Sequence, residues 1–291
     1  MTTSFEDEPR RVIDLLRSCR RRWRGASVDP QELSQGMKIA YCRLNLPTSK
    51  GLDCVPETWS KADLHIHSDH SDGLASIPEI MEYVARQTDL SVIAITDHNT
   101  IEGALLAKSL SDSYDFDVVV GSEVSSSEGH ILGLFLTEDV AAGMTPAETI
   151  SAIEEQGGVA IIAHPFSSKG VFGPLGRNVF ADAVNEGAFR ALEVYNSLPF
   201  LVLANRVAAR LAGGHGIATT GGSDAHVLEA VGKGYTVFRG SSVDDLRQSI
   251  DNLETRAEAE RGGLSLAMRY VWRYRAIRRM QAWNSERCKA H

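Results

Sequence analysis

The segment DLHIHSDHSDG, at residues 63–73, constrains the fold more than any other part of the chain. His65 and His67 alternate within a short apolar run that predicts a β-strand. Side chains at positions i and i+2 leave the same face of a strand, so both imidazoles can reach one metal ion. Asp72 follows in a polar turn that Gly73 closes. Alternating histidines also occur on solvated strand faces, so the interpretation depends on partners further along the chain.

From residue 62 onward, short apolar runs alternate with helical stretches, a pattern typical of βα units and a parallel sheet. One additional strand, at 130–136, is expected to pair back in a hairpin. Helices are predicted at 77–88, 101–111, 146–156 and 200–212. Seven main strands are predicted, at 62–68, 91–98, 117–125, 159–165, 191–197, 217–226 and 234–238.

Candidate metal ligands lie at the C-terminal end of nearly every predicted strand or in the turn after it. In closed α/β barrels that rim is where sites form, because the βα loops converge there. A doubly wound open sheet would gather its site at one switch point, from only a few strands. The distribution therefore favours a barrel. The nine candidates are His65, His67, Asp72, His98, Glu123, His130, His164, Asp224 and His226.

Imidazole and carboxylate ligands together suit zinc, iron and manganese, and none of the four cysteines joins the set. Nine ligands are too many for one ion, but they suit two or three divalent ions that share bridging groups. Taken singly, some members could serve the fold alone, since His98 could cap the following helix and His164 could simply end a strand. Three further histidines, His70, His215 and His291, are left outside the set.

The ordered motifs DLHIHSDHSDG, TDHNT, GSEVS, GHILG, AHP and GSDAH resemble those of the PHP (polymerase and histidinol phosphatase) superfamily of metal-dependent phosphoesterases. The resemblance covers residues 61–253 and implies a distorted (β/α)7 barrel, here with N-terminal and C-terminal helical extensions. It also implies three ion sites. One would take His65, His67, Glu123 and Asp224, a second Glu123, His130 and His164, and the third Asp72, His98 and His226.

The expected activity is phosphoric ester hydrolysis, with a metal-bridging hydroxide attacking phosphorus and no Ser or Cys nucleophile. The leaving group would take its proton from a metal-bound water or from a rim residue such as Asp72 or His226, and the sequence does not choose between them. Arg177, in the loop after the fourth main strand, is the best placed phosphate contact, with Arg206 and Lys233 as further candidates. Three more polar residues could line the pocket or orient ligand histidines: Glu193, Asn196 and Asp97.

The expected substrate is a small phosphorylated metabolite or a nucleotide. The nucleotide phosphatases of the superfamily usually carry a sizeable inserted cap domain, whereas only a hairpin and one helix separate His130 from His164. This predicts a more open site, roofed by the N-terminal arm or by the loop at 166–180. Two alternatives stay open: a 5′–3′ exonuclease acting on short RNA or DNA oligonucleotides, and a non-catalytic metal-binding module.

The two ends of the chain differ from its middle, and we predict a catalytic domain at 61–254 between extensions at 1–60 and 255–291. The middle carries 11 basic and 27 acidic residues, which suits divalent cations better than nucleic acid. An arginine-rich helix is expected near the start, either as a phosphate- or partner-binding arm or as a solvated helix. The basic amphipathic helix at 264–283 would pack on its own domain or self-associate, or bind a membrane surface or nucleic acid.

The chain shows no apolar leader at its N-terminus and no apolar run near the roughly 20 residues of a membrane-spanning helix. Its cysteines are far apart and outside every histidine motif, which favours reduced thiols over a disulfide framework. The sequence therefore predicts a cytoplasmic protein.

Overall fold

Nine strands form one sheet in the computed structural model of the chain, which describes residues 58–174, 176–260, 272 and 275. All seven predicted main strands and the predicted hairpin strand are present. The strands run in the order β7-β6-β5-β4-β3-β2-β1-β8-β9 across the sheet. Their bounds are β1 Trp59–Ile66, β2 Val92–Ile95, β3 Asp117–Ser125, β4 His130–Leu134, β5 Val159–Ile162, β6 Ala191–Asn196, β7 Ala218–Gly222, β8 Gly234–Arg239 and β9 Arg256–Ala259.

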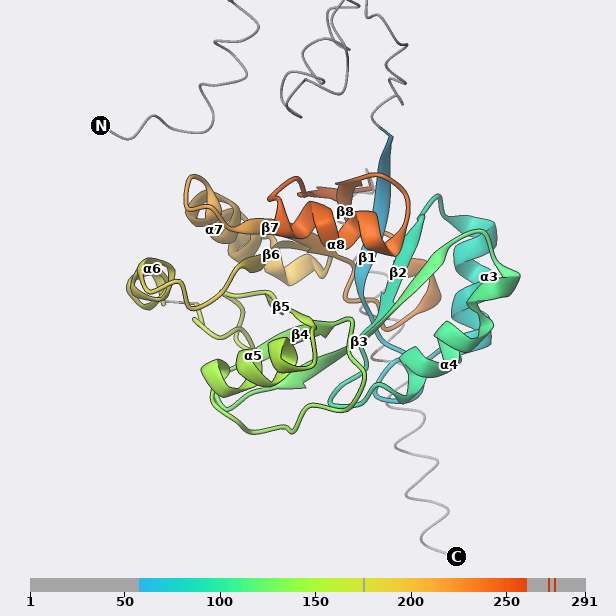
Figure 1. Cartoon of the computed structure of the whole chain (residues 1–291), viewed down its shortest axis with the longest axis horizontal. Helices are drawn as coiled ribbons and strands as arrows, with labels where there is room; N and C mark the ends of the chain where they lie inside the picture. The colour runs from blue at the N-terminus through green and yellow to red at the C-terminus, as the bar shows by residue number, and fades with distance from the viewer. Residues whose placement is uncertain (1–57, 175, 261–271, 273–274, 276–291) are drawn as a thin grey trace, which may run out of the picture. The chain divides into compact units, whose positions relative to one another are not determined.

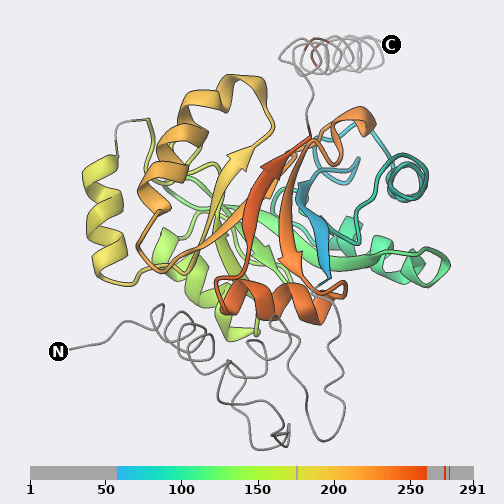
Figure 2. The same ribbon diagram turned by 90° about the horizontal axis from the view of Figure 1, so that it is seen from above.

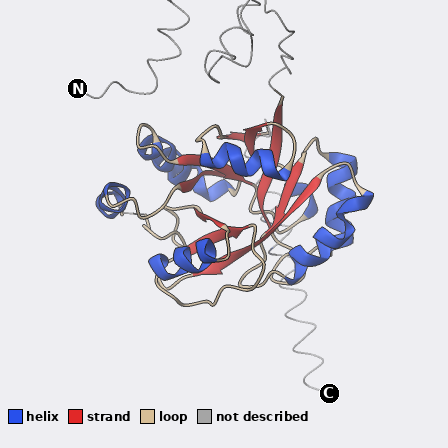
Figure 3. Ribbon diagram, in the orientation of Figure 1, coloured by secondary structure: helices blue, strands red, loops and turns tan. Residues whose placement is uncertain are grey.

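The sheet curls until β7 returns to the end of β1. The amide of His67 donates to the carbonyl of Ala225 at 2.9 Å, and the amide of Ala225 donates to the carbonyl of His65 at 3.3 Å. The Thr236 side chain of β8 also bonds both backbone groups of Gly221 in β7, each at 2.9 Å. The sheet is therefore a nearly closed barrel, and Figure 3 shows its strands surrounded by helices.

Helices cover the outside of this sheet (Figure 1). Helix α4 packs on β2 and β3 with α3 beside it, α5 packs on β4 and β5, and α7 packs on β6. Capping boxes begin α3 at Ser76, α5 at Thr145 and α8 at Ser242, which satisfies amides at those N-termini. The bounds are α3 Ile77–Gln87, α4 Glu102–Leu110, α5 Pro146–Glu155, α6 Arg177–Asn185, α7 Val202–Ala212 and α8 Val243–Asp251.

Helix α8 closes the end of the barrel at which β1 and β3 begin (Figure 2). Its first amide donates to the carboxylate of Asp117, the first residue of β3, at 3.1 Å. The buried Leu246 and Ile250 of α8 join an apolar cluster that takes side chains from β1 through β8. Because so many strands contribute, this cluster fills the inside of the curled sheet on the side that α8 closes.

The predicted (β/α)7 arrangement is corrected in two places. β8 runs antiparallel to β1, and β9 runs antiparallel to β8 and extends the sheet past residue 254. An antiparallel return needs no crossover helix, and the short η4 turn at Leu228–Ala230 carries the chain from β7 to β8. Two helices, α6 and α8, occupy stretches where the sequence pattern predicts no helix.

Three further predictions concern the two ends of the chain and one loop. The predicted extension at 1–60 lies almost wholly outside the described residues, and so does the helix at 264–283. In the loop at 166–180, which is expected to roof the site, Phe166, Phe172 and Phe180 are buried together with ring centroids 5.2–5.7 Å apart. Among the described residues, no helix is long and apolar enough to cross a membrane.

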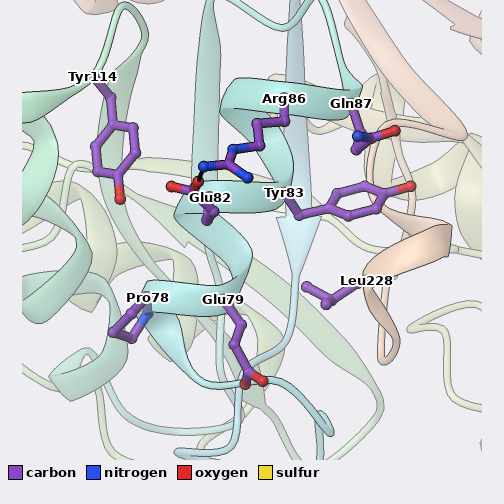
Figure 4. A pocket seen from close by; sticks show the side chains of 8 residues that line it. All are labelled: Pro78, Glu79, Glu82, Tyr83, Arg86, Gln87, Tyr114 and Leu228. Atoms are coloured by element: carbon purple, nitrogen blue, oxygen red, sulfur yellow. Dashed lines mark ion pairs between the residues drawn. The ribbon is translucent and has the colours of Figure 1, made fainter.

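An open groove runs along the outer face of α3 (Figure 4). Tyr114 borders it on one side and Leu228 on the other, and Glu82 pairs with Arg86 within it. None of the nine candidate ligands lines this groove, so the candidate site is located by its chemistry and not by this hollow.

Candidate metal centre

All nine candidate ligands gather at the rim where the parallel strands end. His65 and His67 lie at the end of β1, and Asp224 lies just after β7. His130 opens β4, which runs antiparallel to its neighbours, so the start of β4 meets the ends of β3 and β5. Two of the nine, His164 and Asp224, have left-handed backbones, with φ of 27° and 53°. Such strained conformations persist where the surrounding structure holds them, and they concentrate at functional sites.

The first group of ligand atoms belongs to His65, His67, Glu123 and Asp224. Both Nε2 atoms lie 3.3–3.4 Å from Glu123 Oε2. The distances to Asp224 Oδ1 are 3.7 Å from His65 and 3.3 Å from His67. Two atoms that are each about 2.1 Å from a shared tetrahedral ion lie roughly 3.4 Å apart. These four side chains are therefore spaced to hold one ion.

Glu123 also faces a second group through its other oxygen. Glu123 Oε1 lies 2.7 Å from His130 Nδ1 and 3.0 Å from His164 Nε2. On the first oxygen, Oε2, the Nδ1 atom of His98 approaches to 3.3 Å. Glu123 is 1% exposed, so this carboxylate sits in the middle of the cluster and can bridge two ions.

The third group is centred on Asp72 and forms the more exposed side of the cluster. Asp72 Oδ1 lies 3.2 Å from His226 Nε2, 3.8 Å from His98 Nε2 and 3.7 Å from His67 Nδ1. The side chains of Asp72, His98 and His226 are 30%, 27% and 17% exposed, whereas His65 and His67 are buried. A ligand from solvent therefore reaches the cluster from this side.

Several buried imidazole nitrogens in the cluster find no hydrogen-bond partner among the described residues. They are His65 Nε2, both ring nitrogens of His67, and His98 Nδ1. A buried polar atom without a partner costs about 1–3 kcal/mol, and native structures contain few of them. All four atoms point into the ligand groups described above. Divalent cations would satisfy them, so the donor set fits metal ions.

Protonation in this cluster is governed by burial opposed by charge. Burial favours neutral imidazole at His67, but the adjoining carboxylates of Asp224 and Glu123 outweigh it and raise its pKa to about 10. The same opposition raises the pKa of His65 well above its usual value. Burial likewise favours the protonated acids, yet the histidines hold the pKa of Glu123 and of Asp224 well below the usual range. Protons therefore occupy the imidazoles of His65 and His67 until a cation displaces them.

Two buried aspartates that are not among the nine candidate ligands hold the loops that carry those ligands. Asp97 accepts from the Ser68 amide at 2.8 Å, from Ser68 Oγ at 2.6 Å and from Ser71 Oγ at 2.5 Å. It thereby holds the turn that presents Asp72. Asp63 accepts from the backbone amides of Ser223 and Gly232 at 2.9 and 2.8 Å.

Sequence reasoning assigned no role to Asp63, although an acidic residue inside a predicted strand, two residues before His65, is a signal it could have used. Burial raises the pKa of Asp63 to about 6, against the hydrogen bonds it accepts. Ser167 was also missed: it lies 3.0 Å from His164 Nδ1 and turns the Nε2 atom of that ring toward Glu123. Hydroxyl partners of this kind have no sequence pattern of their own.

Five other residues considered in the sequence belong to none of the ligand groups. His70 bonds Ser68, and His215 packs edge-on against Phe180, so their exclusion from the ligand set agrees with their contacts. Arg177 begins α6, but its side chain lies outside the described residues. Arg206 is exposed on α7, and Lys233 pairs with Glu260.

A nearly closed α/β barrel whose rim gathers imidazoles and carboxylates around shared carboxylate oxygens defines the class of divalent-metal hydrolases. Comparison with known families makes this specific. The PHP domain model matches residues 63–169 and the PHP-associated model matches residues 202–255. The chain belongs to the PHP family of phosphoesterases and is a hydrolase of phosphoric esters, which confirms the expectation from its motifs.

Several known proteins are similar to this chain in sequence or in structure. An uncharacterized protein of Methanocaldococcus jannaschii, MJ1587, is 45% identical over 37% of this chain and 68% of its own length. The phosphoribosyl 1,2-cyclic phosphate 1,2-diphosphodiesterase of Eggerthella lenta is 36% identical over 28% of this chain and 32% of its own length. A two-domain protein of Bacteroides vulgatus containing a predicted PHP-like metal-dependent phosphoesterase has a TM-score of 0.56 at 19% identity, covering 72% of this chain and 68% of that one. That structural likeness shows the fold alone.

Proposed function

We propose that this chain hydrolyses a small phosphorylated metabolite or a nucleotide, using two or three divalent ions of manganese, zinc or iron. The observation that carries the proposal is the complete donor set at the rim, with its spacing between ligand atoms and its unpartnered buried imidazole nitrogens. Bound ions would lower the pKa of water and offset the negative charge that develops on a phosphoryl group. The ligands would be the three groups described above: the first with Asp224, the second around Glu123 and the third around Asp72.

The residues themselves divide into a buried and an accessible set. His65, His67, Glu123 and Asp224 are closed off from solvent, which suits groups that only hold ions. Asp72 and His226 are partly exposed and face each other. Burial notwithstanding, the neighbouring histidines, His226 first among them, keep the pKa of Asp72 below its usual value. Asp72 is then ionised at neutral pH.

His226 Nδ1 donates to the carbonyl oxygen of Asp224 at 2.9 Å, so its Nε2 is the atom turned toward Asp72. Asp72 and His226 both stay our candidates for a proton donor to the leaving group. This role requires that Asp72 and His226 are not both engaged by a third ion. If ions occupy only the first and second ligand groups, Asp72 and His226 stay available for proton transfer. With three ions bound, the pair belongs to the ligand set, and the leaving group takes its proton from elsewhere. The metal stoichiometry of the active protein separates these two forms.

Support for a small substrate comes from the chain around the rim. Between His130 and His164 the chain holds only β4, α5 and β5 with their connections, which gives the site an open approach. The Eggerthella lenta relative is named for a cyclic phosphodiester of ribose, a compound of this size class. For phosphate recognition, Arg177 stays our candidate, and exposed Arg206 is a second one. Lys233 is a weaker candidate because Glu260 already pairs with it.

One alternative substrate is retained because the sequence motivates it. The basic ends of the chain suit the strand of a short oligonucleotide, as in a 5′–3′ exonuclease. The domain boundaries at 60 and 254, self-association through the C-terminal segment, and a cytoplasmic location also stay proposals that rest on the sequence.

The test combines metal analysis with a substrate screen. Purified protein would be assayed with manganese against phosphomonoesters, nucleoside bisphosphates, cyclic phosphodiesters and short oligonucleotides. We expect bound metal and turnover of a small ester, and the double variant His65→Ala with Asp224→Ala should lose both while keeping its far-ultraviolet circular dichroism. Turnover retained by the double variant would refute the role of the cluster. Metal binding without turnover of any of these compounds would refute the proposed substrate class.

A further inference from the structure

Two polar residues at the end of β6 lie beside the cluster without belonging to any of its ligand groups. Glu193 and Asn196 are each 1% exposed. A carboxylate this deeply buried is costly unless hydrogen-bond donors surround it. The contacts of Glu193 show which donors these are, and they lead to three of the candidate ligands.

Glu193 accepts at both of its oxygens. Its Oε1 lies 3.0 Å from His65 Nδ1. Its Oε2 accepts from the backbone amide of His164 at 2.8 Å and from Asn196 Nδ2 at 3.2 Å. Both of the Oε2 partners are obligate donors, because a backbone amide and a side-chain NH2 cannot accept. An amide side chain at position 193 would satisfy one partner only by turning its own NH2 against another donor.

The acceptor character of Glu193 fixes the tautomer of the His65 ring. A carboxylate opposite Nδ1 requires that Nδ1 carries the proton, so in the neutral ring the lone pair lies on Nε2. Nε2 is the atom that faces Glu123 and Asp224 in the first ligand group. Glu193 therefore presets His65 as a ligand and holds the plane of its ring.

Asn196 extends the same arrangement to Asp224. Its Nδ2 donates to Asp224 Oδ2 at 3.0 Å as well as to Glu193, and its Oδ1 accepts from the Leu198 amide at 3.0 Å. The oxygen of Asp224 that Asn196 engages is not the one that faces the histidines, which is Oδ1. Asn196 therefore orients Asp224 without competing for its ligand oxygen.

The packing leaves no slack around these contacts. A Cβ added at Gly222 would lie 2.6 Å from His65 Cβ and 2.7 Å from Glu193 Oε1. Carbon atoms do not approach that closely, so only glycine lets β7 pass beside the Glu193–His65 pair. The pair is thus held by the barrel itself and not by a flexible loop.

We propose that Glu193 and Asn196 are positioning residues that couple two ion sites, since together they hold His65 and Asp224 of the first group and His164 of the second. The proposal rests on the proposed function only in that the cluster binds divalent ions. It predicts that one substitution on β6, at a residue that touches no ion, weakens binding at both sites together. The expected loss of affinity is about 10–100-fold, the range typical of groups that orient metal ligands.

The experiment is a calorimetric titration of Mn²⁺ into the metal-free full-length chain and into Glu193→Gln, with Glu154→Gln as the matched control. Glu154 is exposed on α5 and lies outside every ligand group. We expect Glu193→Gln to weaken both binding events about 10–100-fold and the control to bind like the parent. Asn196→Ala should weaken them in the same direction and supplies the result if Glu193→Gln does not fold.

A second readout separates positioning from general stability. Nitrogen-15 NMR of labelled histidine, with His65 assigned from His65→Ala, reports which ring nitrogen carries the proton. At a pH high enough for the neutral ring, His65 should be the Nδ1–H tautomer in the parent and a mixture in Glu193→Gln.

Unchanged Mn²⁺ affinity in Glu193→Gln, or weakening at one site only, would overturn the coupling, as would a parent that binds no Mn²⁺. Failure of the proposed function looks different: the parent would bind Mn²⁺, with the Glu193 effect intact, and hydrolyse none of the phosphoesters.

Discussion

Metal binding to this protein should release protons, and the number follows from the two most buried histidines. The carboxylates of Asp224 and Glu123 overcome burial and raise the pKa of His67 to about 10. At pH 7, about three units below this pKa, the His67 ring of the metal-free protein is protonated. Removing its proton so that a ring nitrogen can bind metal costs about 4 kcal/mol. His65 is shifted in the same direction. We therefore expect one to two protons to leave when the first group takes up an ion.

The assay is calorimetric titration of Mn²⁺ into metal-free protein at pH 7, repeated in buffers with different ionisation enthalpies. Apparent affinity should rise about tenfold per pH unit for each proton released, between about pH 6 and 9. His215→Ala serves as the control, because His215 lies on Phe180 and outside the cluster. An affinity that does not change with pH, together with zero protons released, would refute the reasoning.

The same shift sets how the stability of the metal-free protein changes with pH. The pKa of His67 is higher in the folded protein than its ordinary value of 6.5. Its contribution to the free energy of unfolding is therefore complete below about pH 6.5 and is lost as the pH rises toward 10. Metal-free protein should lose stability toward urea over that window. Protein loaded with Mn²⁺ should not, because its imidazoles are already deprotonated.

Three further substitutions test separate parts of the structure. Gly222→Ala should lower the free energy of unfolding by about 1–3 kcal/mol in urea titrations, because its Cβ collides with His65 and Glu193; an unchanged midpoint would contradict the packing described. Asp97→Asn should weaken the most loosely bound ion in equilibrium dialysis, because it loses an acceptor for the turn at Asp72, and equal metal content would count against it. Phe180→Ala should cost about 3–5 kcal/mol, because the ring is 1% exposed within the aromatic cluster; a cost below about 1 kcal/mol would show that the cluster is not packed as described.

The parts of the fold that the sequence predicted well are those with a local signature. Each strand that carries a candidate ligand was found, because an apolar run ending in a polar turn is visible in a short window. Helix α8 could also have been predicted, since Ser242 and Asp245 form a capping box. The orientation of β8 could not, because strand direction depends on how the chain returns to the sheet and not on side-chain pattern.

The candidate site divides in the same way. Ligand residue types recur in compact motifs, so the nine candidates could be named from the sequence. The residues that orient these ligands could not be identified with the same certainty, because their role depends on which hydrogen-bond donors and acceptors surround them in the fold. Glu193 matters because three donors converge on it, and Ser167 matters because its hydroxyl meets one ring nitrogen. Such convergence exists only after residues far apart in sequence have been packed together.

The most direct test of the central claim is anomalous diffraction, at the manganese absorption edge, from crystals of the full chain grown with Mn²⁺. The account predicts two or three anomalous peaks at the rim, one of them shared between the oxygens of Glu123 and Asp224 and the Nε2 atoms of His65 and His67. Crystals grown with Mn²⁺ that show no anomalous peak within reach of Glu123 would contradict the claim that this cluster binds metal ions.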